Sequence, residues 1–254
     1  MLRFILFFIL GFQLSSVASA SETVKVGGYI FPPFVEEDSE GNLSGMTFDM
    51  INAFNAIQDQ YHFEFVLTAS NRRYLSFQKK EYDLIFFENK VWGWKGYPVK
   101  PSKVYLKGSE VYIALKKPKR TQHYFNSLEG KKLVGIRGYH YGFANFNSNE
   151  QYLNENFNIL LTSDHQGSVN MISSGRGDIA VVTKSFLQKL FKAQPLLQET
   201  LLVSEILDQE YHHTILVRDN SVPTVQEINL FLDKLESLEH LKTIWSKYGI
   251  TEMN

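Results

Sequence analysis

The stretch YDLIFF, residues 82–87, is an apolar run of the length of a β-strand. Runs of this kind, without polar alternation, are typical of parallel strands that are buried on both faces of a sheet. The stretch GDIAVVT, residues 177–183, has the same character later in the chain. We therefore predict two buried parallel strands, one in each half of the chain.

Strand and helix patterns alternate around these two runs. Further strands are predicted at residues 24–29, 63–67 and 132–136, and helices at 46–57, 71–80, 149–156, 168–174 and 185–192. The pattern restarts after the basic stretch KKPKR, residues 116–120. Such alternation predicts a doubly wound α/β architecture in two successive halves. An apolar stripe from Ile228 to Tyr248 predicts a single C-terminal helix that packs against a sheet.

The first twenty residues have the features of a secretory signal peptide. Arg3 precedes an apolar run at 4–12, and small residues lead to a cleavage site after Ala20. Cleavage leaves 254 − 20 = 234 residues. The run is too short for a membrane-spanning helix, which needs about 20 apolar residues. We expect a protein exported to the periplasm.

Composition excludes several classes of function. The 26 basic and 27 acidic residues nearly balance, which argues against nucleic acid as a partner. The chain has no cysteine, so its core must hold it together without disulfides. Motifs for a nucleophile elbow, a zinc protease or a phosphate-binding loop are missing, and we predict no catalytic residue, no cofactor and no metal.

Several stretches, taken in order, resemble the family 3 bacterial extracellular solute-binding proteins, which mostly serve amino-acid importers. They are VGGYIFPPF, GNLSGMTFDMINAF, KKEYDLIFF, LEGKKLVGIRGYHYG, SSGRGDIAVV and LKTIWSKYGI. The resemblance implies the two-lobed α/β fold of the type II periplasmic binding proteins. Each lobe would be a mixed, mostly parallel sheet flanked by helices, and two crossover strands would join the lobes. It places the first lobe at 21–108 and 210–254, and the second at 109–209.

The resemblance also implies a function. The protein would capture a small polar solute, an amino acid or a related compound, by hinge closure, and would present it to an inner-membrane permease or a signalling receptor. We expect a monomer. Two alternatives stay open: a dehydratase-like enzyme with its site in the cleft, for which Glu88 and His140 are the only nearby acid and base, and an interaction module without a transport role.

Candidate ligand-binding residues follow from the position of the strands. Ligands of open α/β sheets bind at the carboxyl ends of the strands, so the residues that follow each strand are the ones to inspect. These residues are Tyr29, Phe31 and Phe34 after the first strand, Glu88 after the buried run, and Arg137, Tyr139, Tyr141 and Thr183 in the second half.

Three basic residues could bind a carboxylate. Arg72 and Arg73 open a predicted helix, and family members of one subset place a cleft-facing arginine near this position. Two adjacent arginines cannot both face the cleft. Where the family commonly has an arginine for the ligand α-carboxylate, this chain has Lys95, and where it commonly has an acid for the α-ammonium group, it has Thr183. A standard α-amino acid is therefore not the expected ligand, and Glu88 is the substitute acid that we consider.

The segment LVGIRGYHYGF, residues 133–143, contains three glycines. Their spacing does not match a dinucleotide-binding fingerprint. We predict instead a turn from a strand to a helix, whose free backbone N–H groups attract an anionic part of the ligand together with Arg137.

Overall fold

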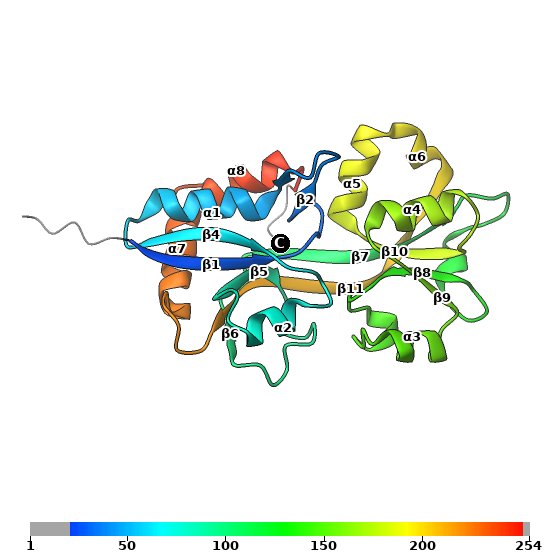
Figure 1. Cartoon of the computed structure of the whole chain (residues 1–254). Helices are drawn as coiled ribbons and strands as arrows, with labels where there is room; N and C mark the ends of the chain where they lie inside the picture. The colour runs from blue at the N-terminus through cyan, green and yellow to red at the C-terminus, as the bar shows by residue number, and fades with distance from the viewer. Residues whose placement is uncertain (1–20, 251–254) are drawn as a thin grey trace, which may run out of the picture.

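The computed structural model describes residues 21–250. The predicted signal peptide lies outside the described residues. The described chain forms two lobes, each with its own helices packed around strands (Figure 1). No helix in this part of the chain is long and apolar enough to cross a membrane.

The first lobe contains the N-terminal elements and the two C-terminal helices. Its elements are β1 (Glu22–Gly28), β2 (Glu36–Glu37), β3 (Leu43–Ser44), α1 (Met46–Ile57), β4 (Tyr61–Leu67), α2 (Arg73–Gln78), β5 (Leu84–Glu88), β6 (Val99–Pro101), α7 (Val225–Ser237) and α8 (His240–Lys247). β1 lies between β4 and β5 and is parallel to both. The predicted strands at 24–29, 63–67 and 82–87 are confirmed within two residues at their ends.

The second lobe repeats this plan. Its elements are β7 (Leu106–Leu115), η1 (Gln122–Phe125), β8 (Leu133–Ile136), η2 (Gly142–Ala144), α3 (Glu150–Asn156), β9 (Ile159–Thr162), α4 (His165–Ser173), β10 (Ile179–Thr183), α5 (Lys184–Ala193) and α6 (Pro195–Thr200). β8 lies between β9 and β10 and is parallel to both, while β7 is antiparallel to β10. Both lobes therefore have the mixed sheet that the resemblance implied, although in each lobe three parallel strands are bordered by antiparallel ones, so the sheets are not mostly parallel.

One strand, β11 (Leu201–Arg218), serves both lobes. Its first part pairs with β7 from Leu201 to His213, and its last part pairs with β5 and β6 from Thr214 to Arg218, always antiparallel. β7 and β11 run side by side between the lobes (Figure 1). They are the crossover strands that the resemblance implied.

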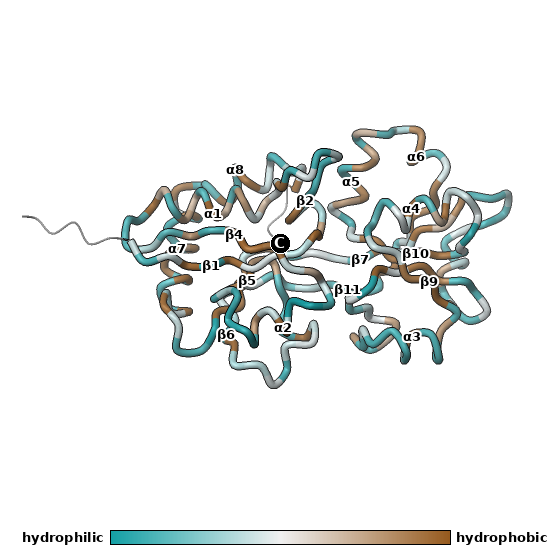
Figure 2. Tube along the Cα trace, viewed as in Figure 1, coloured by the Kyte–Doolittle hydropathy of each residue, from teal (hydrophilic) through white to brown (hydrophobic). Residues whose placement is uncertain are grey.

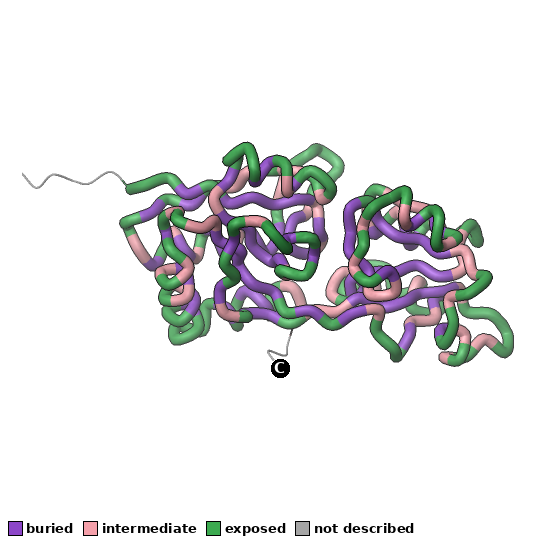
Figure 3. Tube along the Cα trace, turned by 90° about the horizontal axis from the view of Figure 1, so that it is seen from below, coloured by how far each residue is buried: buried purple, intermediate pink, exposed green. Residues whose placement is uncertain are grey.

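Burial follows the strands in each lobe. All five residues of β5 and all five of β10 are buried, as the apolar runs predicted. Figure 2 shows hydrophobic residues concentrated in the strands of the second lobe, and Figure 3 shows the buried chain at the centre of each lobe with exposed loops around it. Apolar burial of this extent is the main favourable term in folding.

The prediction of a single C-terminal helix is wrong. α7 ends at Ser237, and Glu239 takes a left-handed conformation with φ 55° before α8 begins. The side chain of Leu238, at the break in the stripe, is 50% exposed, whereas Leu241 and Trp245 are buried. The turn lets both helices bury their apolar faces, and neither glycine nor proline marks it in the sequence.

Candidate functional site: a cavity between the lobes

A small cavity, with a volume of about 10 Å³ and so room for about one water molecule, lies between the lobes. Four aromatic residues line it, Tyr29, Phe31, Trp92 and Tyr139. Four polar residues complete the lining, Arg73, Glu110, His140 and Gln209. Most of these residues follow β1, β5 and β8 or begin α2, so the cavity lies at the carboxyl ends of the parallel strands, where ligands of open α/β sheets bind.

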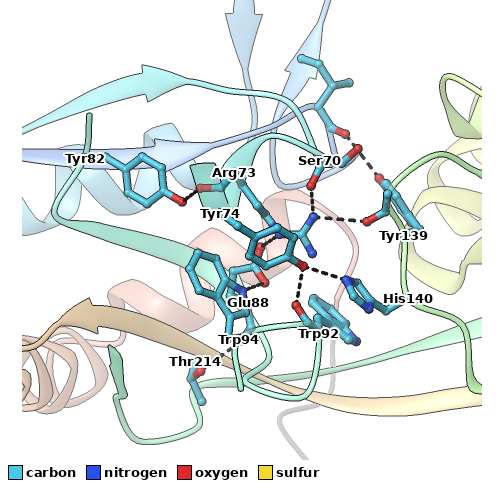
Figure 4. A network of polar contacts seen from close by, with 12 residues as sticks. Ser70, Arg73, Tyr74, Tyr82, Glu88, Trp92, Trp94, Tyr139, His140 and Thr214 are labelled. Atoms are coloured by element: carbon cyan, nitrogen blue, oxygen red, sulfur yellow. Dashed lines mark hydrogen bonds and ion pairs between the residues drawn. The ribbon is translucent and has the colours of Figure 1, made fainter. Parts of the chain in front are cut away.

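Arg73 and Glu88 form a buried ion pair at one side of this cavity. Arg73 Nε lies 3.0 Å from Glu88 Oε1, and the side chains are 1% and 0% exposed. Trp94 Nε1 donates a hydrogen bond of 2.8 Å to the other oxygen, Glu88 Oε2 (Figure 4). Burial raises the pKa of Glu88, and the charge of Arg73 lowers it in turn. Arginine stays protonated, so the pair is one of opposite charges.

The guanidinium of Arg73 has further partners on both sides of the cavity. Nη1 donates to the carbonyl oxygens of Ser70 and Gly138, the second at 3.3 Å. The guanidinium carbon also lies 4.8 Å from the ring centre of Tyr29 and 4.5 Å from that of Tyr74, within the range of cation–π attraction. Much of the donor capacity of Arg73 is therefore used within the protein.

Glu110 is a second buried acid, and it has an unused oxygen. Thr183 Oγ1 donates to Glu110 Oε1 at 2.8 Å, and the Tyr211 hydroxyl donates to the same oxygen at 3.4 Å. Glu110 Oε2 is buried without a hydrogen-bond partner, and the residue is 2% exposed. Burial raises the pKa of Glu110 to about 8, the hydrogen bonds from Thr183 and Tyr211 oppose this rise, and the charge of the nearby Asp208 adds to it.

A neutral histidine completes this cluster. His165 Nε2 lies 2.8 Å from Thr183 Oγ1, and burial lowers the pKa of His165 to about 3. Since the Thr183 proton goes to Glu110, the same hydroxyl accepts from His165 Nε2–H. His165 therefore adds no charge beside Glu110.

Direct contacts join the two lobes around the cavity. Ser70 Oγ donates to the carbonyl oxygen of Arg137 at 2.8 Å. The Tyr74 hydroxyl lies 2.7 Å from His140 Nε2 (Figure 4). Tyr139 donates to the carbonyl oxygen of Ile30 at 3.3 Å. These contacts show a closed arrangement of the lobes.

Gly138 allows the lobes to approach this closely. Its φ of 76° is left-handed, and a Cβ at this position would lie 2.7 Å from the backbone nitrogen of Asn71 in the first lobe. A larger residue would push the lobes apart or strain the turn.

The predicted ligand-binding residues fall into three groups. Tyr29, Phe31, Arg73 and Tyr139 line the cavity. Phe34, Glu88, Tyr141 and Thr183 are buried but do not line the cavity. Phe34, Glu88 and Thr183 contact residues that line it, whereas Tyr141 supports the turn after β8. Arg72, Lys95 and Arg137 are exposed and lie outside the lining.

The structure gives a reason for each exposed residue. Arg73 takes the inward position of the first turn of α2, so its neighbour Arg72 points to solvent. Trp92 and Trp94 are buried on either side of Gly93, which leaves Lys95 outside. Arg137 is 54% exposed and pairs with Glu150 at 3.7 Å.

The prediction for the turn after β8 is wrong in its main point. The backbone N–H groups of Gly142 and Phe143 do not face a ligand, because Asp208 accepts both, at 2.7 and 3.0 Å. The helix that follows is a 3₁₀ turn of three residues. An internal carboxylate thus holds the position at which an anionic ligand group was expected.

Trp92, Glu110 and Gln209 were missed from the sequence. Glu110 was missed because β7 runs antiparallel to β10, so that the N-terminal part of β7 reaches the carboxyl end of β10 and Glu110 pairs with Thr183. The rule that inspects residues after strands does not apply to an antiparallel neighbour. A glutamate directly before the apolar run VYIAL, residues 111–115, was the available signal.

Within residues 21–250, no group of three acidic or histidine side chains is placed to hold a metal ion.

Comparisons with known proteins give matches by structure alone. No protein-family model matches the chain, and no curated protein matches its sequence. An ABC uptake transporter substrate binding protein from Streptococcus pneumoniae, solved with bound histidine, superposes with a TM-score of 0.71 at 16% identity, over 91% of this chain and 95% of that one. The GluR0 ligand-binding core from Nostoc punctiforme, solved with L-glutamate, superposes with a TM-score of 0.69 at 16% identity, over 89% of this chain and 99% of that one.

A third solved structure is an ancestral amino-acid-binding protein described as a precursor of cyclohexadienyl dehydratase. It gives a TM-score of 0.66 at 16% identity, over 89% of this chain and 95% of that one. Similarity over nearly the whole length of all three structures shows that this chain has the two-lobed α/β fold of the type II periplasmic binding proteins.

Proposed function

We propose that the protein captures a small polar solute in the periplasm, in the cavity between its lobes, and closes on it by a hinge. The observation that supports this most directly is the lining of the cavity, to which both lobes contribute and in which the buried Glu110 Oε2 has no partner. Buried polar atoms in folded proteins are almost always paired, so an unpaired carboxylate oxygen on a residue that lines the cavity favours a ligand there.

Closure would take place about the crossover strands. We place the first lobe at 21–108 and 210–254 and the second at 109–209, which fits the change of partner along β11. The solute shifts the equilibrium toward the closed form because only that form surrounds it.

The closed monomer would then be recognised by a membrane partner. The names of the solved relatives, an uptake-transporter component and a ligand-binding core, support either an inner-membrane permease or a signalling receptor.

Binding and closure can be measured together. Calorimetric titration and thermal shift with amino acids, organic acids, polyamines and sugars should identify a solute that binds at one site, and small-angle scattering should show compaction in the same sample. Phe31→Ala, which removes a wall of the cavity, should abolish binding, whereas the exposed Arg72→Ala should leave it intact. A full panel without any stabilising solute would contradict the proposal.

An enzyme on the same scaffold is the second candidate, since His140 and Glu110 both line the cavity. Glu88, considered from the sequence as the acid partner of His140, instead pairs with Arg73. Conversion of a bound solute to product in an NMR time course, lost in His140→Gln, would favour the enzyme; binding without product would favour the binding protein.

A further inference from the structure

The two lobes also meet away from the cavity, through two elements of opposite charge. In the first lobe, β2 and β3 pair to form an acidic hairpin, residues 36–44, which has no basic residue. Its acidic residues are Glu36, Glu37, Asp38 and Glu40. In the second lobe, α5 has no acidic residue and carries three lysines, Lys184, Lys189 and Lys192. Figure 1 shows β2 next to α5.

One ion pair connects the acidic hairpin to α5. Lys189 Nζ lies 2.6 Å from Glu36 Oε1 and 2.5 Å from Glu36 Oε2. The side chains of Lys189 and Glu36 are 49% and 21% exposed. Among the ion pairs formed by residues 21–250, this one alone joins the first lobe to the second.

Each of the two elements is held firmly by its own lobe. Within the acidic hairpin, Asp38 accepts from the backbone N–H groups of Glu40 and Asn42, at 2.8 and 2.9 Å. In α5, Leu187 and Leu190 are buried in the core of the second lobe. Closure therefore brings together two charged surfaces that are already formed.

A second lysine of α5 also reaches the first lobe. A Cβ at Gly249 would lie 2.6 Å from Lys192 Nζ, so this ammonium group lies directly after the end of α8. A cation is favourable near the C-terminal end of a helix because the helix dipole is negative there. Lys192 thus adds to the attraction between α5 and the first lobe.

Salt ions can reach the contact between Glu36 and Lys189. Both residues line an open groove with a volume of about 450 Å³, far more than that of the cavity around Arg73. Screening acts over a Debye length of about 8 Å at 0.15 M salt and about 3 Å at 1 M. Because the two charges belong to different lobes, opening about the crossover strands would separate them.

We propose that the acidic hairpin and α5 form an electrostatic clasp, which favours the closed arrangement of the lobes at low ionic strength and weakens as ionic strength rises. This inference goes beyond the proposed function, because the clasp acts on the lobes themselves and needs no solute. A solute that binds the closed form would bind more weakly at high salt, since less of the protein is then closed.

Single-molecule FRET on the protein without solute measures the ratio of open to closed molecules. The chain has no cysteine of its own. Ala56→Cys in α1 and Ser173→Cys in α4, both at exposed positions, place one dye on each lobe. The ratio should be higher at about 1 M NaCl than at about 0.05 M, because salt screens the clasp.

Variants of the ion pair test whether the clasp causes this change. At low salt, Lys189→Gln should raise the open-to-closed ratio by about 1.5- to 5-fold, the range for an exposed ion pair. Lys189→Glu should raise it further, because it adds a fifth acid beside the hairpin. Glu36→Lys combined with Lys189→Glu restores a pair with exchanged charges and should return the ratio toward that of the wild type.

Lys103→Gln is the matched control. Lys103 pairs with Asp233 and Glu236 inside the first lobe, so its loss should leave the ratio unchanged. Equal ratios in the wild type and Lys189→Glu at low salt would overturn the inference, whether the lobes are open or closed. An effect of Lys103→Gln as large as that of Lys189→Gln would also overturn it. Failure of the proposed function would show separately, as a solute panel without binding.

Discussion

Replacement of Glu110 by glutamine should stabilise the protein at neutral pH. The ordinary pKa of a glutamate is 4.5, and burial raises that of Glu110 to about 8. Between these values the unfolded chain releases the proton while the folded chain keeps it. Over this range the free energy of unfolding therefore falls as pH rises, by about 1.4 kcal/mol per pH unit.

The penalty at pH 7 follows from the same numbers. Between pH 4.5 and pH 7 the free energy of unfolding of the wild type falls by about 3 kcal/mol relative to that of a chain with no ionisable group at this position. Glutamine keeps an oxygen that accepts from Thr183 and Tyr211. Its amide nitrogen takes the place of a protonated oxygen that is also an unpaired donor, so the substitution adds one N–H donor but no buried charge. For a chain of this size, about 3 kcal/mol corresponds to a rise in Tm of roughly 6–12 °C.

Urea unfolding of the wild type and Glu110→Gln at pH 5, 7 and 8.5 measures this effect. The variant should be more stable at pH 7 by about 3 kcal/mol, and the difference should shrink to below about 1 kcal/mol at pH 5, which lies only half a unit above the unfolded pKa of 4.5. Glu210→Gln serves as the control for a lost surface charge. A difference that is the same at pH 5 and 7, or a variant that is less stable at pH 7, would refute the reasoning.

Two further predictions concern the same region. Glu88→Gln should lower the free energy of unfolding by about 3–5 kcal/mol because it leaves Arg73 charged and unpaired, and the double change to Glu88→Leu with Arg73→Met should recover much of that loss in urea melts. If the ion pair of Arg73 and Glu88 were itself the source of stability, the double variant would not recover the lost free energy of unfolding. Gly142→Ala should destabilise by about 1–3 kcal/mol or more, since its Cβ would lie 2.0 Å from the backbone oxygen of Asp208; an unchanged Tm would contradict this.

The sequence was sufficient for the parts of the fold that local pattern determines. The runs at 82–87 and 177–183 became β5 and β10, because a strand buried on both faces needs apolar residues at every position. The two-lobed arrangement came from the resemblance rather than from periodicity. The break between α7 and α8 could not be predicted from the sequence, since no glycine or proline marks the left-handed conformation of Glu239.

The candidate site was only partly predictable, for a geometric reason. Residues that follow parallel strands were found, and Tyr29, Phe31, Arg73 and Tyr139 do line the cavity. Glu110 escaped because it comes from an antiparallel strand, whose direction is set by pairing across about seventy residues of chain. The choice between Arg72 and Arg73 likewise depends on how α2 is rotated against the sheet, which adjacent identical residues do not encode.

The shared strand β11 has a consequence for how the molecule comes apart. Its eighteen residues contribute backbone hydrogen bonds to both cores, first to β7 and then to β5 and β6. Neither core can melt without releasing part of a strand on which the other depends. Heat should therefore produce one cooperative transition in calorimetry, with equal calorimetric and van't Hoff enthalpies, although the chain is built as two bodies.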